Sequence, residues 1–216
     1  AVGADAIAVF TAASERFTKR NINVTIDQSI AAFRDVVRAA KRDGCWVRGY
    51  VSTAFGSPFG DAVTPEMVVD VSLKLMEMGC DELSIGDTMG VGVPSQVNAL
   101  VPLLAEKIPL ELLAMHFHDT RGTALANVYA ALQQGIIKFD ASSGGLGGCP
   151  YAPGATGNVG TEDVLYLLHE MGIETGVDIE KVRAASRFIA TVVDHALTSK
   201  AYQAMEAAAA ASIAWM

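Results

Sequence analysis

Short apolar segments alternate with longer amphipathic ones along the 216 residues of the chain. The short segments are enriched in Val, Ile and Phe and have the length of strands. The longer segments repeat apolar residues three and four positions apart, which is the period of a helix with one buried face. The predicted strands are Asp5–Phe10, Trp46–Thr53, Glu82–Gly86, Leu112–His118 and Ile137–Ser142.

Capping residues mark several helix boundaries between these strands. Thr64 is a typical N-cap followed by a proline at the first helical position, and Gly79 ends that helix. Thr161 is expected to cap a later helix, which Gly172 stops. The predicted helices are Ile26–Arg42, Pro65–Met78, Pro94–Lys107, Thr123–Gln134, Thr161–Met171 and Asp178–Leu197.

Five strand–helix repeats with short connections predict an α/β fold with a parallel sheet and helices outside it. An open doubly wound sheet and a TIM barrel both fit that pattern. No GxGxxG follows the first strand, so the dinucleotide-binding open sheet loses support. Polar residues cluster where the strands end, which is the catalytic face of a barrel. We therefore expect one TIM-barrel domain over residues 1–200, followed by an alanine-rich helical tail over residues 201–216.

Composition narrows the class of protein. A hydrophobic fraction of 51% with 19% charged residues is typical of a compact globular chain, and no apolar run approaches the ~20 residues of a membrane span. The net charge of −8 argues against a nucleic-acid partner. The first ten residues lack the basic start of a secretory signal, and the three cysteines are widely spaced without a CxxC. We expect a cytoplasmic protein with neither nucleic acid nor membrane as partner.

The segment LLAMHFHDT, residues 112–120, carries the first candidate chemistry. Residues i and i+2 of a strand point to the same side, so His116 and His118 should project together at the strand end. Two imidazoles held in this way can bind one divalent metal. The alternative is a pair of hydrogen-bonded polar residues without a metal; the following carboxylate, Asp119, and the position at a strand end favour the metal.

A second candidate is the segment GLGGCPYAPGATGN, residues 145–158, in which glycine and proline exclude a helix or a central strand. It follows the fifth strand and therefore lies on the catalytic side. Such a loop is either an ordinary long connection, a mobile lid or a backbone cradle for an anion. The thiol of Cys149 in its middle is a candidate for catalysis or redox control.

Together with HFHDTRG, GDTMGVGVP and FTKRNIN, this loop resembles the 3-hydroxy-3-methylglutaryl-CoA lyases of the bacterial type, which are DRE-TIM metallolyases. The resemblance runs from Asp5 to about Lys200. The HxHD motif is shared with condensing relatives such as the isopropylmalate synthases, whereas the glycine-rich loop is much more specific to the lyases.

The resemblance implies roles for individual residues. His116, His118 and Asn158 match metal ligands, and His116 is also a candidate proton carrier. Cys149 matches the catalytic loop cysteine. Asp87 matches a catalytic aspartate at the mouth of the barrel. The residues that match substrate- or coenzyme A-binding positions, or acidic positions near the metal, are Lys19, Asn21, Thr88, Glu162 and Asp163.

The implied reaction is the retro-Claisen cleavage of (S)-3-hydroxy-3-methylglutaryl-CoA into acetyl-CoA and acetoacetate, as in leucine degradation. The implied cofactor is Mg²⁺ or Mn²⁺, because two imidazoles with oxygen ligands suit these ions; zinc is a competitor. The resemblance also implies an acyl-CoA substrate as partner, and we expect a homo-oligomer, most simply a dimer.

The sequence departs from the family pattern at its first strand, where the Asp-Arg-Glu-type motif of the family is missing. Five βα units also cannot close an eight-stranded barrel, so the chain should cover about the last five units. Three readings remain open: an incomplete form of a working lyase, a related enzyme that condenses an acyl-CoA with a 2-oxo acid, and an inactive partial barrel that binds metal or coenzyme A. The retained His116, His118, Cys149 and Asn158 favour the first.

Overall fold

The structure is a computed structural model that describes residues 3–148 and 157–211. These residues form one sheet of five parallel strands, whose order in space, β1-β2-β3-β4-β5, is their order in the sequence. An open doubly wound sheet reverses its strand order at a switch point, whereas a barrel adds each strand beside the last. The barrel-type prediction is therefore confirmed. The strands are β1 (Ala6–Ala12), β2 (Trp46–Ser52), β3 (Glu82–Asp87), β4 (Leu113–Phe117) and β5 (Phe139–Asp140).

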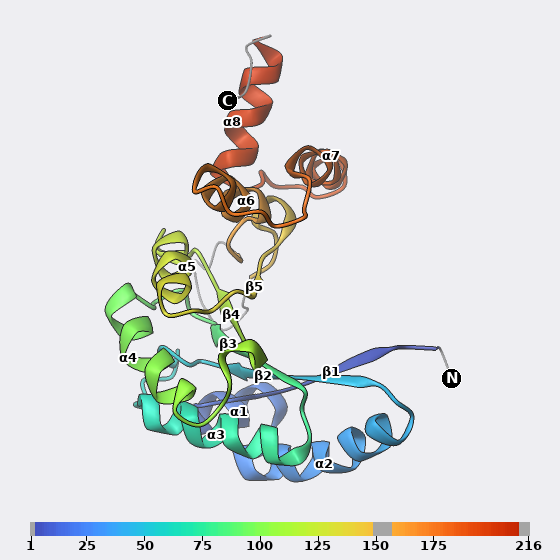
Figure 1. Cartoon of the computed structure of the whole chain (residues 1–216), viewed down its shortest axis with the longest axis vertical. Coiled ribbons are helices and arrows are strands. Elements are labelled where there is room, and N and C mark those ends of the chain that lie inside the picture. Colours follow the sequence, from blue (N-terminus) through green and yellow to red (C-terminus); the bar gives the residue numbers. More distant parts are fainter. Residues whose placement is uncertain (1–2, 149–156, 212–216) are drawn as a thin grey trace.

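Helices connect successive strands, and Figure 1 shows α2 and α3 along one side of β1 and β2. At the other end of the molecule, α6, α7 and α8 follow the last strand. No helix of the described ranges combines the length and the hydropathy that a membrane crossing requires. The helices are α1 (Glu15–Ile22), α2 (Ile26–Arg42), α3 (Pro65–Met78), α4 (Pro94–Ala105), α5 (Ala124–Gln133), α6 (Thr161–Glu170), α7 (Ile179–Ala190) and α8 (Lys200–Ala210), with short 3-10 turns η1 (Leu110–Leu112) and η2 (Ser143–Gly145).

Local capping explains where several helices begin. The Thr64 hydroxyl accepts a hydrogen bond from the Met67 N–H, as the sequence predicts, and Gly79 ends α3 in a left-handed conformation with φ 110°. Helix α1 was not predicted from the sequence. Its eight residues are too few to display a clear period, and the Ser14 hydroxyl, which accepts from Phe17 N–H, starts it.

Three boundary predictions are wrong. Helix α7 ends at Ala190 rather than at residue 197, where the β-branched Thr191, Val192 and Val193 follow. Thr161 is the first helical residue of α6 rather than its cap, because Gly160 holds the N-cap position. The strand expected at 137–142 shortens to the two residues of β5.

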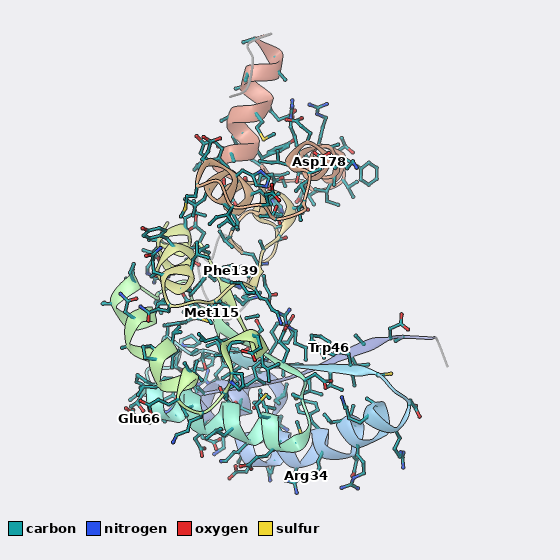
Figure 2. All side chains as sticks on the ribbon, viewed as in Figure 1. Arg34, Trp46, Glu66, Met115, Phe139 and Asp178 are labelled. Carbon is teal, nitrogen blue, oxygen red and sulfur yellow. The ribbon has the colours of Figure 1, made fainter. Side chains whose placement is uncertain are left out.

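The hydrophobic core lies between the sheet and its helices. Alternate residues of each strand face the helices, and Val47, Val51, Leu83 and Ile85 there are completely buried. Met115 of β4 pairs with Phe139 of β5, near the middle of the molecule in Figure 2. Because one set of alternate strand residues packs against the helices, the residues between them face the opposite, concave side of the sheet.

The concave side of β1 is open. Ala6, Ala8 and Phe10 are exposed there, while the alternate residue Val9 is buried. Trp46 of β2 also remains 41% exposed. Within the described ranges no sixth strand pairs with either edge of the sheet. The fold therefore presents the inside of an open barrel wall rather than a closed barrel.

Candidate active site

A pocket of about 460 Å³ opens on the concave side, toward the C-terminal ends of the strands. Four residues with predicted roles line it: Asn21, Thr88, His116 and His118. The other lining residues come from β1, α1, β2, β3 and the loop after η2: Ala8, Phe10, Phe17, Tyr50, Val51, Ser52, Gly86 and Gly148.

The two histidines share this pocket, as strand alternation predicts. Their ring centroids lie 5.3 Å apart. His118 is only 6% exposed, and burial together with the neighbouring His116 lowers its pKa to about 4. The imidazole of His118 is therefore neutral at physiological pH, which is the form that binds a metal.

Asn158 joins His118 although forty residues separate them in sequence. The two residues face each other in an antiparallel bridge, which hydrogen bonds on both sides support: Val159 N–H donates to Phe117 O at 3.0 Å and Asp119 N–H to Gly157 O at 3.1 Å. The structure thus brings together the three residues predicted as metal ligands near the end of β4.

Two polar atoms in this group have no hydrogen-bond partner among the described residues. The Asn158 amide is oriented by its Nδ2, which donates to Leu146 O at 2.9 Å, and its Oδ1 is buried and unpartnered. The Nδ1 of His118 is likewise buried without a partner. Buried polar atoms are rarely left unpaired, so both atoms are candidates for contact with a ligand.

This donor set fits a divalent cation. Imidazole nitrogen and amide oxygen are ligands that Mn²⁺ accepts, and Mg²⁺ takes the oxygen with water and substrate oxygens besides. Within residues 3–148 and 157–211, no three His, Cys, Asp or Glu side chains gather closely enough to hold a metal. The described part of the site could therefore supply His116, His118 and Asn158 to a cation, and a complete coordination sphere would need ligands in addition to these.

Behind His116 lies a chain of charged residues across the sheet. His116 Nδ1 lies 3.2 Å from Asp140 Oδ2, and Arg48 Nη1 donates to Asp140 Oδ1 at 2.7 Å. Arg48 Nε forms an ion pair with Glu82 Oε1 at 2.9 Å, although its angle is not that of a hydrogen bond. The Lys138 ammonium pairs with the other oxygen of Glu82.

Asp140 remains ionised in this setting. Burial alone would raise the pKa of its carboxyl, but hydrogen bonds from His116 and Ser84 and the charge of Arg48 hold that pKa below its usual value. Neither Asp140 nor Arg48 is predicted as a site residue from the sequence. A signal was present, because each is a charged residue inside a strand pattern, where a charge must find a partner.

Two other predicted residues lie at or near the pocket. The Thr88 hydroxyl accepts a hydrogen bond from Thr53 N–H at 2.8 Å, and Thr53 adopts a left-handed backbone with φ 58°. Such a conformation is uncommon for a threonine and often accompanies a functional site. Lys19 lines a separate hollow of about 370 Å³ with Arg16, Arg20 and Phe59.

The structure does not bring Asp87 into the pocket. Asp87 is 1% exposed and accepts hydrogen bonds from Val91 N–H at 3.1 Å and Gly92 N–H at 2.9 Å. Burial raises the pKa of this carboxyl, against the lowering effect of those N–H groups. Its neighbour Thr88 lines the pocket instead, because successive residues of an extended segment point to opposite sides.

Glu162 and Asp163 also lie outside the pocket lining. Glu162 is completely buried and accepts hydrogen bonds from Gly144 N–H at 2.9 Å and from the Ser186 hydroxyl. Asp163 accepts from Ala201 N–H at 2.6 Å, at the start of α8. Both carboxylates therefore tie α6 to its neighbours.

Cys149 lies outside the described residues, although the preceding Gly148 lines the pocket.

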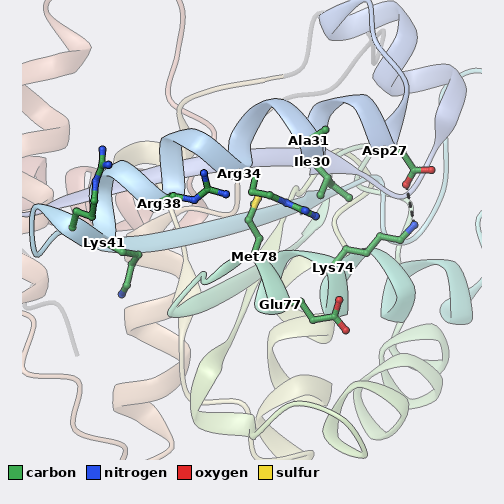
Figure 3. A pocket seen from close by; sticks show the side chains of 10 residues that line it. Asp27, Ile30, Ala31, Arg34, Arg38, Lys41, Lys74, Glu77 and Met78 are labelled. Carbon is green, nitrogen blue, oxygen red and sulfur yellow. Dashed lines mark hydrogen bonds and ion pairs between the residues drawn. The ribbon is translucent and has the colours of Figure 1, made fainter.

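A larger hollow of about 960 Å³ lies on the outer, helical side between α2 and α3 (Figure 3). Its wall carries Arg34, Arg38 and Lys41, and Lys74 pairs with Asp27 at its edge. None of the residues with predicted roles lines it. The larger of these two hollows is therefore not the one that contains the predicted site residues.

Comparison with known proteins supports the same family as the sequence motifs of the site. The family model described as HMGL-like matches residues 1–189. The hydroxymethylglutaryl-CoA lyase of Pseudomonas mevalonii is 51% identical over 208 residues, which is 96% of this chain and 69% of the relative. The cytoplasmic 3-hydroxy-3-methylglutaryl-CoA lyase of Mus musculus is 50% identical over 94% of this chain and 60% of its own length.

Solved structures of lyases also resemble this chain. The hydroxymethylglutaryl-CoA lyase of Pseudomonas aeruginosa superposes with a TM-score of 0.92 at 48% identity, covering 95% of this chain and 68% of that one. A lyase from Acinetobacter baumannii, solved in complex with coenzyme A and 3-methylmalate, gives a TM-score of 0.87 at 34% identity, with 93% and 65% covered. The chain thus spans about two thirds of the length of these relatives. The family match over residues 1–189 and the identity of about one half to hydroxymethylglutaryl-CoA lyases show that this chain belongs to the HMGL-like family.

Proposed function

We propose that this chain carries the greater part of the active site of a divalent-metal-dependent carbon–carbon lyase. Its substrate is (S)-3-hydroxy-3-methylglutaryl-CoA and its products are acetyl-CoA and acetoacetate. The observation that carries the proposal is that two buried polar atoms, His118 Nδ1 and Asn158 Oδ1, have no hydrogen-bond partner among the described residues, in the group that includes the pocket residue His116. The names and the identity of the relatives support the choice of substrate.

The reaction sets two proton tasks. The C3 hydroxyl of the substrate loses its proton as the C2–C3 bond breaks, and the bonding electrons move to C2. The C3 fragment leaves as acetoacetate, while the other fragment is the enolate of acetyl-CoA. Protonation of that enolate at C2 completes acetyl-CoA, so one proton is removed and one is returned.

His116, His118 and Asn158 are the residues that would hold the cation, Mg²⁺ or Mn²⁺. When bound, the cation supplies Lewis acidity that favours loss of the hydroxyl proton. We assign the proton transfers to Cys149, which follows the pocket residue Gly148, and to His116, which lies in the pocket and can accept a proton at Nε2 when the cation does not occupy that nitrogen.

The acyl-CoA would enter over α1. Asn21 lines the pocket, and Lys19 lies in the neighbouring hollow beside Arg16 and Arg20, whose positive charges suit phosphate groups. We assign Thr88 to contact the substrate. For Asp87, Glu162 and Asp163 we propose supporting roles, because their carboxylates already accept hydrogen bonds from the surrounding protein.

The proposal also includes a place in leucine degradation, which the resemblance implies, together with a cytoplasmic location and a homodimer, which are expectations from the sequence itself. The family's Asp-Arg-Glu-type residues, which the first strand of this chain does not carry, would complete the catalytic set. The second candidate function is a metal- and CoA-binding partial barrel without activity, which would use the same pocket residues.

Acetoacetate release from 3-hydroxy-3-methylglutaryl-CoA by the purified chain tests the proposal. We expect release with Mg²⁺ or Mn²⁺, loss with EDTA and loss in His116→Ala. His195→Ala is the matched control, because that histidine is exposed and lies outside the pocket. Metal binding without release would favour the binding module. Condensation of acetyl-CoA with a 2-oxo acid, without lyase activity, would favour the condensing relatives.

A further inference from the structure

Asp140 occupies an unusual place behind the candidate site. It belongs to the two-residue strand β5, directly opposite His116 in the register of β4 and β5. Its side chain lies on the concave side with those of Arg48, Ser84 and His116, each from a different strand. One carboxylate therefore links β2, β3, β4 and β5.

Each oxygen of this carboxylate has a defined partner. Oδ1 accepts from Arg48 Nη1 at 2.7 Å, and Oδ2 accepts from the Ser84 hydroxyl at 2.8 Å. The 3.2 Å contact of Oδ2 with His116 Nδ1 completes the set. An ionised carboxylate only accepts hydrogen bonds, so the proton in this last contact must sit on His116 Nδ1.

The position of Asp140 is itself fixed. Arg48 also pairs with Glu82 at 2.9 Å and donates to the Tyr50 hydroxyl at 3.1 Å, so its guanidinium cannot turn away without losing these contacts. The Tyr50 ring stands edge-on to the His116 ring, with 84° between their planes. The imidazole is thus held at its Nδ1 edge by Asp140 and flanked by an aromatic ring.

We infer that Asp140 is a positioning residue that fixes His116 as the Nδ1–H tautomer and leaves its Nε2 lone pair free on the pocket side. This inference rests on the proposed function. A free Nε2 is useful there because a metal, or a proton from the substrate, needs an unprotonated ring nitrogen to bind. Arg48 and Ser84 act through Asp140 by holding the carboxylate in place. The roles of Asp140, Arg48 and Ser84 do not follow from the family resemblance, because none of these residues lies in the motifs that carry it.

The tautomer can be read without metal or substrate. In the ¹⁵N-histidine-labelled chain, long-range proton–nitrogen spectra at mildly alkaline pH distinguish a protonated from an unprotonated ring nitrogen, and His116→Ala identifies the His116 signals. We expect a protonated Nδ1 and an unprotonated Nε2 in the wild type. In Asp140→Asn, which keeps the shape of the side chain, we expect both tautomers, while Asp35→Asn on the surface of α2 leaves the spectrum unchanged.

Mn²⁺ titration followed by electron paramagnetic resonance measures the consequence. We expect Asp140→Asn to weaken Mn²⁺ binding roughly 10- to 100-fold, which is the usual effect of losing a group that orients a ligand. Ser84→Ala should weaken it less, because the Arg48 contact remains. If Asp140→Asn does not fold, the tautomer of His116 in the wild type and the Mn²⁺ affinity of Ser84→Ala still test the inference.

An Nε2–H tautomer in the wild type, or unchanged spectra and Mn²⁺ affinity in Asp140→Asn, would overturn the inference. Failure of the proposed function has a different signature. The wild type would then have the Nδ1–H tautomer but would neither bind Mn²⁺ nor release acetoacetate. That result would support the orientation of His116 by Asp140, but not a role of this orientation in catalysis.

Discussion

Gly147 stands directly against the side-chain amide of Asn158. A Cβ atom built on Gly147 would lie 2.5 Å from Asn158 Nδ2, which is closer than any real contact of this kind. The backbone of Gly147 also has φ 105°, a conformation that favours glycine. The glycine-rich segment therefore shapes the candidate metal site, because it leaves room for the amide that presents Asn158 Oδ1.

Gly147→Ala should weaken metal binding. The added methyl group displaces the Asn158 amide, and we expect Mn²⁺ affinity to fall roughly 10- to 100-fold, as for loss of a group that orients a ligand. Isothermal titration measures the change. Gly172→Ala is the matched control, because it has a similar backbone, φ 73°, with nothing within 4 Å of the new Cβ. An unchanged Mn²⁺ affinity in Gly147→Ala, or an equal loss in Gly172→Ala, would contradict the role of the Asn158 contact.

Glu162→Ala should destabilise the fold strongly. The substitution leaves Gly144 N–H and the Ser186 hydroxyl without their acceptor in a site where both glutamate and serine are completely buried. We expect a loss of about 2–4 kcal/mol in the free energy of unfolding, measured by urea titration.

Glu170→Ala, on the exposed end of the same helix, is the comparison for Glu162→Ala and should change stability by less than about 0.5 kcal/mol. A similarly small effect of Glu162→Ala would mean that its hydrogen bonds do not hold α6 to η2 and α7.

Cys80 should make stability fall at alkaline pH. Burial raises the pKa of its thiol from 9.0 to about 11. Between these values the unfolded chain releases the proton while the folded chain retains it, so the free energy of unfolding decreases as pH rises. The full window corresponds to about 3 kcal/mol.

Urea unfolding of wild type and Cys80→Ala at several pH values tests this. Subtracting the two curves removes the titration of all other groups, and the difference should grow between pH 9 and 11. Cys45→Ala, at a half-buried cysteine, provides a second comparison. A difference that does not vary with pH would contradict the raised pKa of Cys80.

Trp46 should contribute to self-association of the chain. It is 41% exposed on β2, and in Figure 2 it stands apart from the helices that cover the other face of the sheet. Apolar side chains on an open sheet face favour association. We expect Trp46→Thr to weaken association about tenfold in sedimentation velocity.

Val36→Thr controls for the general effect of removing an exposed apolar side chain, since Val36 is 46% exposed on α2. Equal behaviour of the wild type and both variants would show that the concave face is not the surface through which copies associate.

Much of the fold follows from local patterns. The bounds of α2 match the prediction, and those of β2, β3 and α4 differ from it by no more than two residues, because amphipathic periods and caps depend on neighbouring residues alone. Alternation also brings His116 and His118 to one pocket. The same rule shows why Thr88 reaches the pocket and Asp87 does not, a distinction that motif resemblance does not make.

The sequence by itself determined the parallel α/β class, the barrel-type strand order and the pair of histidines at a strand end. Only the tertiary structure decided which side chains meet them: Asn158 opposite His118, and Asp140 behind His116 with Arg48, 92 residues away along the chain. The physical reason is that such contacts depend on the register between strands and on loop closure. The sequence around each of these residues does not indicate its partner, and the partner is determined only when the strands lie side by side.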